Sequence, residues 1–179
     1  MTFSTTLCTC TTTPCPEEGV NKLIVGNGTT GVYVYELTSD RDVPRVAQVD
    51  VLLQQTDLDH GSDTSSCTQE YSRAMEDDGL DNVDAGHILA HHLGGPGNEP
   101  INIFPQSLHY NRGSYSSQEG QIYDCLSAAK EGSYATLHWE FYYNDTTSTQ
   151  PHEVLYQADF SDSEGCSSIS TVFPNTYYG

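Results

Sequence analysis

Apolar and polar residues alternate along several segments of the chain, a pattern that predicts β-strands with one buried face. The clearest segment is 135–143, where Leu137, Trp139 and Phe141 face one way and polar side chains face the other. Residues 154–160 repeat the alternation after a polar stretch. We therefore expect these two strands to form an antiparallel hairpin.

Three more strands are predicted in the first third of the chain. Residues 22–25 and 32–37 lie on either side of a turn signal at Gly26-Asn27-Gly28. The third strand is marked by four apolar residues, of which only the last three alternate: Val46, Val49, Val51 and Leu53. The tail from Ser161 is polar and is expected to be held at Cys166.

Helical spacing of apolar residues is best developed over 114–130, where Gly132 follows as a stop signal. A shorter helix is predicted over 67–75. The order of strands, a loop and helix, and then a hairpin indicates a single α+β domain with an antiparallel sheet. One face of the longer helix is expected to carry Tyr115, Ile122, Leu126 and Ala129.

Charge narrows the range of partners. The 179 residues contain 6 Lys and Arg against 25 Asp and Glu, which gives a formal charge of −19. Such a balance argues against a continuous basic nucleic-acid clamp and against attraction to anionic lipid. Nine of the acids fall within 57–84, which we interpret as a solvated acidic face. No apolar run reaches the roughly 18 residues that a membrane span requires.

The six cysteines suit three disulfides in an oxidising compartment, with fifteen possible pairings. We expect residues 1–19 to be an irregular segment tethered by disulfides and 20–179 to be the folded domain. The first residues lack the basic and apolar regions of a secretory signal, so we expect a secreted protein whose signal peptide has been removed. The alternative is a cytosolic protein with free thiols. The cysteines are Cys8, Cys10, Cys15, Cys67, Cys125 and Cys166.

Residues 84–119 carry the most specific signal, and they read DAGHILAHHLGGPGNEPINIFPQSLHYNRGSYSSQE. This run resembles the DNA/RNA non-specific endonuclease family, the ββα-metal or His-Me finger nucleases, in the order, spacing and residue types of its motifs. The resemblance covers about a fifth of the chain and implies a ββα-metal finger within the α+β domain. Its motifs are Asp84-x-Gly86-His87, Leu93-Gly94-Gly95-Pro96-Gly97, Asn102-Ile103-Phe104-Pro105-Gln106 and Asn111-Arg112-Gly113, followed by Glu119.

The residue types suit phosphodiester hydrolysis. His87 can accept a proton from water near neutral pH, so we assign it as the general base. Asn111 can offer a neutral amide oxygen to Mg²⁺, a hard cation that keeps several waters. The resemblance places the family's metal-binding Asn at this position. The alternative is that Asn111 caps the following helix. Mn²⁺ is an expected substitute for Mg²⁺. Eight residues of helix separate Asn111 from Glu119, a rise of about 12 Å, so Glu119 is expected to act through a metal-bound water.

Other residues are given supporting roles. Asn102 and Gln106 are expected to brace the loop and to orient His87 or a metal water. Relatives often carry Arg where this chain has Ala85, and can carry a basic residue where it has Tyr123. With both positions lost, Arg112, which is adjacent to Asn111, is the best remaining candidate for a phosphate ligand. Arg45 and Arg73 are possible phosphate ligands whose positions the sequence does not give.

These observations predict a metal-dependent endonuclease that hydrolyses DNA and RNA with little sequence preference, and the resemblance implies products with 5′ phosphates. Neither a membrane nor an obligate protein partner is expected. The alternative is a weak or inactive nuclease fold that binds another protein, which the charge of −19 favours. A zinc peptidase is disfavoured because Ile88 stands where its motif needs Glu after His87.

Overall fold

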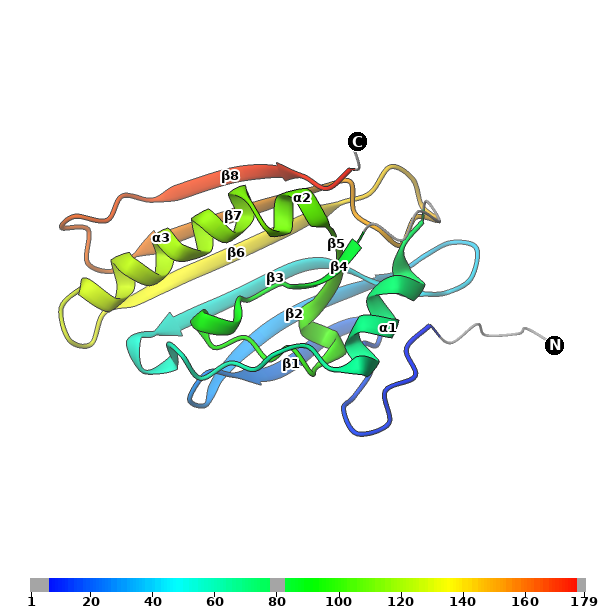
Figure 1. The fold of residues 1–179 in the computed structure, drawn as a ribbon, viewed down its shortest axis with the longest axis horizontal. Coiled ribbons are helices and arrows are strands. Elements are labelled where there is room, and N and C mark those ends of the chain that lie inside the picture. The colour runs from blue at the N-terminus through cyan, green and yellow to red at the C-terminus, as the bar shows by residue number, and fades with distance from the viewer. Residues whose placement is uncertain (1–6, 78–82, 177–179) are drawn as a thin grey trace.

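The computed structural model describes residues 7–77 and 83–176, and its centre is a six-stranded antiparallel sheet (Figure 1). The strand order is β1-β2-β3-β6-β7-β8, so each strand pairs with a neighbour in sequence except where β3 meets β6. This confirms a single α+β domain with an antiparallel sheet. The strands are β1 (Gly19–Val25), β2 (Thr29–Leu37), β3 (Pro44–Gln54), β6 (Tyr134–Tyr142), β7 (Glu153–Phe160) and β8 (Ile169–Pro174).

The two predicted hairpins form, and their registers bury the expected apolar faces. β1 pairs with β2 across the predicted turn, and β6 pairs with β7, with Trp139 opposite Tyr156. The interrupted alternation in β3 has a structural cause: Val34 pairs with Gln48 but Tyr35 pairs with Val46, which leaves Ala47 as an extra residue. This bulge restores the inward direction of the valine that precedes it.

Helix α3 (Ser114–Ala128) lies along one face of the sheet, as Figure 1 shows. Three of the four residues predicted for its apolar face are buried, Tyr115, Ile122 and Leu126, while Ala129 follows the helix as its cap. Tyr115 also accepts a hydrogen bond from the Trp139 indole at 3.0 Å, which ties the helix to β6. Helix α1 (Ser66–Met75) confirms the shorter predicted helix.

A second, two-stranded sheet joins the main sheet to the helices. β4 (Val83–His87) runs antiparallel to β5 (Ile103–Ser107), and the short helix α2 (Leu108–Asn111) follows β5 directly. The loop between the two strands packs its apolar residues against the inner face of the main sheet. The result is a strand-loop-strand-helix unit with the predicted ββα order. Three 3-10 turns complete the connections: Gln55–Asp57, His91–Leu93 and Pro100–Asn102.

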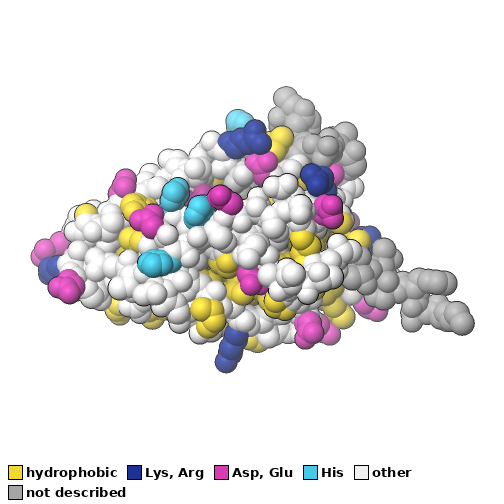
Figure 2. Space-filling view, turned by 60° about the horizontal axis from the view of Figure 1, so that its bottom comes forward, with side chains coloured by type: hydrophobic (Ala, Val, Ile, Leu, Met, Phe, Trp, Pro, Cys, Tyr) yellow, Lys and Arg dark blue, Asp and Glu magenta, His cyan; other side chains and the backbone are white. Residues whose placement is uncertain are grey.

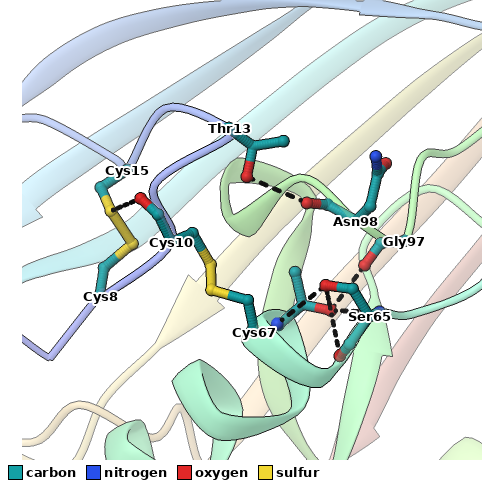
Figure 3. Close-up of a disulfide and its surroundings, with 9 residues drawn as sticks. Cys8, Cys10, Thr13, Cys15, Ser65, Cys67, Gly97 and Asn98 are labelled. Atoms are coloured by element: carbon teal, nitrogen blue, oxygen red, sulfur yellow. Dashed lines mark hydrogen bonds between the residues drawn. A yellow bond between two sulfur atoms is a disulfide. The ribbon is translucent and has the colours of Figure 1, made fainter.

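All six cysteines are paired, which confirms three disulfides and removes the free-thiol alternative. Cys8 pairs with Cys15 inside the N-terminal segment, and Cys10 pairs with Cys67 at the start of α1 (Figure 3). The third bridge joins Cys125 of α3 to Cys166 in the tail. The N-terminal segment is therefore fastened to α1.

Two sequence expectations need correction. The polar tail contains β8, an edge strand whose Phe173 is buried while Val172 is exposed. The acidic stretch 57–84 is not uniformly solvated, because Asp57 is 1% exposed. Its carboxylate accepts hydrogen bonds from the Asn27 and Gln54 amides and the Thr29 hydroxyl, at 2.9, 2.8 and 2.7 Å, and so closes the β1–β2 turn against β3. Among the described helices, none is long and apolar enough to cross a membrane.

Candidate active site

His87 is the last residue of β4 and is only partly exposed. Its Nε2 lies 2.9 Å from the Ser62 carbonyl oxygen. Burial lowers the pKa of the imidazole from its ordinary value, and the bond to Ser62 and the charge of Asp63 only partly oppose this. The ring is therefore neutral at physiological pH, as a proton acceptor must be.

The glycine-rich loop after His87 makes room for this ring. A Cβ atom on Gly97 would lie 2.6 Å from His87 Nε2, so no side chain fits there. Gly94 ends the 3-10 turn with φ of 97°, a left-handed conformation that favours glycine. The loop therefore forms a tight turn, and Gly97 is the glycine that packs against His87.

Asn102 braces this loop from beneath. It is completely buried, and its Oδ1 accepts hydrogen bonds from the Tyr33 hydroxyl at 2.7 Å and the Leu89 amide at 2.9 Å. Its Nδ2 donates to the carbonyls of Leu89 and Pro96 at 3.0 and 3.2 Å. Since all of these partners belong to the fold, Asn102 holds the loop in place and has no group left for substrate.

Asn111 is the last residue of α2, and its side chain is held by Asp84 of β4. Asn111 Nδ2 donates to Asp84 Oδ2 at 2.7 Å, while Arg112 donates to both oxygens of the same carboxylate, at 3.0 and 3.2 Å. Asn111 does not cap α3, because Gly113 is the cap residue and makes no side-chain bond. The capping alternative is therefore excluded.

The unit brings Asn111 to the strand that ends in His87. Asp84 precedes His87 by three residues, a distance of about 10 Å along an extended strand. A hollow of about 390 Å³ opens beside this strand, and Asp84, Ala85 and Asn111 are part of its wall. Among the described residues, no three His, Cys, Asp or Glu side chains converge as a metal cage. A divalent ion here would depend on few protein ligands.

Glu119 faces a different hollow from Asn111. It lies two turns along α3 and lines a cleft of about 450 Å³ with His92 and Tyr123. Burial raises the pKa of this carboxyl to about 8, so in the absence of a nearby cation it is protonated at neutral pH. The structure thus separates Glu119 from the amide of Asn111, in agreement with the long helical rise between them.

A row of histidines near His87 has no counterpart in the sequence expectations. The His87 and His91 rings stack at 6.4 Å, and those of His91 and His92 at 5.1 Å. His91 pairs with Asp63 at 3.0 Å, and Tyr123 donates to Asp59 at 2.6 Å. Figure 2 shows histidine side chains lying among acidic ones on one face, with few basic side chains nearby. Only the 3-10 turn at 91–93 aligns these rings, and its sequence carries no clear signal for it.

The two arginines left unplaced by the sequence have different surroundings. Arg45 is 7% exposed; it pairs with Glu36 at 3.0 Å and lies over the Tyr143 ring at 3.9 Å, so its role is structural. Arg73 is exposed and lines the same hollow as Asn111.

The described residues thus contain a unit of two antiparallel strands and a helix, with His87 at the end of β4 and Asn111 anchored to Asp84 at the end of α2. The profile of the DNA/RNA non-specific endonuclease family matches residues 25–159. This protein belongs to that family.

Similar proteins agree with this assignment. The chain is 35% identical over 104 residues to the probable deoxyribonuclease RhsA of Dickeya dadantii (strain 3937), a match that covers 58% of this chain and 7% of that protein. NucA from Streptococcus agalactiae has a similar fold: its metal-free structure aligns with a TM-score of 0.57 at 14% identity, over 92% of this chain and 84% of NucA. The magnesium-bound structure of NucA aligns with a TM-score of 0.55 at 12% identity, over 88% of this chain and 85% of NucA.

Proposed function

We propose that the protein is a Mg²⁺-dependent endonuclease that cleaves DNA and RNA internally, with His87 as the general base and Asn111 as the metal ligand. The observation that carries this proposal is the Asp84 carboxylate, which fixes Asn111 to the strand that ends in His87. The magnesium-bound NucA structure supports a divalent ion in this fold. Mn²⁺ is expected to substitute, since it accepts the same oxygen ligands.

The contact with Ser62 supports Nδ1 as the nitrogen of His87 that acts as the base. A carbonyl oxygen only accepts hydrogen bonds, so Nε2 must carry the ring proton in the neutral imidazole. The lone pair is then on Nδ1, which has no hydrogen-bond partner among the described residues. His87 Nδ1 accepts the proton of the attacking water, and Ser62 keeps the ring in the tautomer that this requires.

The amide of Asn111 fits a hydrated Mg²⁺. Its Nδ2 is used by Asp84, which leaves Oδ1 without a partner in the described part of the chain and free to act as a ligand. One neutral oxygen ligand is compatible with an ion that keeps most of its waters. When bound, Mg²⁺ supplies positive charge for the phosphorane and the leaving 3′ oxygen. Because Glu119 lines a different hollow from Asn111, it is proposed to act through a water of the ion and not as a direct ligand.

The reaction is an in-line hydrolysis. The water oxygen forms a bond to phosphorus while His87 takes its proton, and the bond from phosphorus to the 3′ oxygen breaks. The 3′ oxygen then takes up a proton from solvent, so the products carry a 5′ phosphate and a 3′ hydroxyl. Arg112 is placed beside Asn111 and can support the phosphate. Because the sequence contains no recognisable base-reading motif, we expect little sequence preference.

The test is digestion of plasmid DNA and of a structured RNA with Mg²⁺, with Mn²⁺ and with EDTA. We expect cleavage of both substrates that EDTA abolishes, and a loss of at least about 1,000-fold in His87→Ala and Asn111→Ala. Matched controls are His138→Ala and Asn21→Ala, which should leave cleavage unchanged because their side chains bond to Asp50 of β3 and to Glu17 before β1, outside the finger. Wild-type protein without any cleavage would favour a protein-binding module instead. The three disulfides support export to an oxidising compartment, which we propose as its location.

A further inference from the structure

The hollow beside Asn111 has an arginine in its wall that the mechanism above does not use. Arg73 lies in the last turn of α1 and reaches this hollow together with Gln69, one helical turn earlier. Residues four apart lie on the same face of a helix, so α1 presents both polar side chains to the space in front of the Asn111 amide. A phosphate at that amide would enter the same space.

Helix α1 is fixed to the finger, so the position of Arg73 is defined by the fold. The Thr68 hydroxyl donates to the Gly97 carbonyl at 2.7 Å, next to Cys67 in Figure 3. The Ser72 hydroxyl donates to the Asp84 carbonyl at 2.9 Å. Cys67 adds a covalent tie to the N-terminal segment. Ser72 is the residue before Arg73, and Asp84 is the residue that holds Asn111, so this contact fixes the end of α1 beside the anchor of Asn111.

Arg73 is also the basic side chain best able to bind an anion there. Among the described residues it forms no ion pair, whereas Arg112 is already bound to both oxygens of Asp84. Arg41 and Arg45 pair with their own acids away from the finger. The remaining basic residues, Lys22 in β1 and Lys130 after α3, do not line the hollow.

We propose that Arg73 binds a non-bridging phosphate oxygen of the nucleic acid in the hollow that it lines with Asp84 and Asn111; this inference rests on the proposed nuclease function. A guanidinium matches phosphate geometry with two parallel donors, which a lysine at the same position would not reproduce. Gln69 borders the same space as a neutral donor. The segment that recognises the substrate is therefore α1, which precedes the nuclease finger in the chain.

The experiment compares Arg73→Gln and Arg73→Lys with wild type and with a matched control, Arg41→Gln. For cleavage of a defined duplex with Mg²⁺, we expect Arg73→Gln to lower kcat/KM by about 10- to 100-fold, mainly through KM, and Arg73→Lys to recover part of the loss. Arg41→Gln should behave as wild type. Thermal unfolding of each variant checks that α1 remains intact. Equal kinetics in Arg73→Gln and wild type would overturn the proposal, and so would a loss that Arg73→Lys fails to reduce.

A binding measurement separates this inference from the function on which it rests. In the His87→Ala background, fluorescence anisotropy with the same duplex and Mg²⁺ should show at least about 10-fold weaker binding when Arg73→Gln is added, with a salt slope of log Kd smaller by about 1. If wild-type protein does not cleave, the proposed function fails, yet this comparison still reports on Arg73. If wild type cleaves and binding is unchanged by Arg73→Gln, only the assignment of Arg73 fails.

Discussion

Replacement of Glu119 by glutamine should stabilise the fold while it reduces cleavage. Burial raises the pKa of this carboxyl to about 8 from an ordinary value of 4.5. Between pH 4.5 and pH 8 the folded protein holds a proton on Glu119 that the unfolded chain releases. The contribution of Glu119 to the free energy of unfolding is therefore complete below pH 4.5 and is lost as the pH rises towards 8. The linkage slope is about 1.4 kcal/mol per pH unit, and we expect an observed loss of about 2 kcal/mol, since the side chain keeps some contact with water.

The assay is urea unfolding followed by fluorescence of Trp139, which is completely buried, at pH 5 to 8 in EDTA so that no divalent ion reaches Glu119. The unfolding free energy of Glu119→Gln should exceed that of wild type by an amount that grows with pH to about 2 kcal/mol at pH 8. Glu131→Gln, on the exposed turn after α3, should show no such growth. Parallel pH curves for wild type and Glu119→Gln would refute the burial argument. Cleavage by Glu119→Gln should fall at least about 10-fold, and full activity would remove Glu119 from the mechanism.

Three other predictions concern the loop, the base and the charge. Asn102→Ala should lower the unfolding free energy by about 3 kcal/mol, because it leaves the Tyr33 hydroxyl and loop backbone groups unpaired. Chemical denaturation measures this loss, and Asn98→Ala on the exposed part of the loop is the matched control. The pH profile of kcat/KM should fall on the acid side with an apparent pKa below the ordinary 6.5 of histidine, since burial lowers the pKa of His87 and a protonated ring cannot accept a proton; a limb at or above 6.5 would contradict this environment. Cleavage should show a flat or rising response to added salt at low ionic strength, and a steep fall would contradict the charge argument.

Sequence periodicity was sufficient for the parts of the fold that bury regular apolar faces. The β6–β7 hairpin and helix α3 were predicted because their inward residues recur at strand or helix spacing, and the β1–β2 hairpin because a turn signal separates its strands. β8 was missed because an edge strand buries little, and only Phe173 marks it. The buried Asp57 was misassigned because charge in a sequence gives no sign of the backbone amides that will surround it.

The sequence indicated candidate residues for the site but not the contacts that hold them. The motif spacing indicated His87 and Asn111, and the strand-to-helix unit joins them as expected. The bond from Asp84 to Asn111 spans 27 residues, and Ser62 reaches His87 from a separate loop, so neither contact has a local pattern. Arg73 could not be placed for the same reason, since its position depends on how α1 packs against β4.

The charge of −19 and a polyanionic substrate are compatible because of where the few basic side chains lie. Arg73 and Arg112 both border the Asn111 region, while acids such as Asp50 and Glu140 lie on strands of the main sheet, clustered around His138. Screening reduces interactions between exposed charges over about 10 Å at 0.1 M salt, so remote acids oppose binding mainly at low ionic strength. In the proposed mechanism, the local field at the phosphate is then set by two guanidinium groups, by Asp84, by Asp63 near His87 and by the divalent ion. Removing Arg73 or Arg112 should therefore weaken nucleic-acid binding more than the same substitution at any other basic residue on the surface.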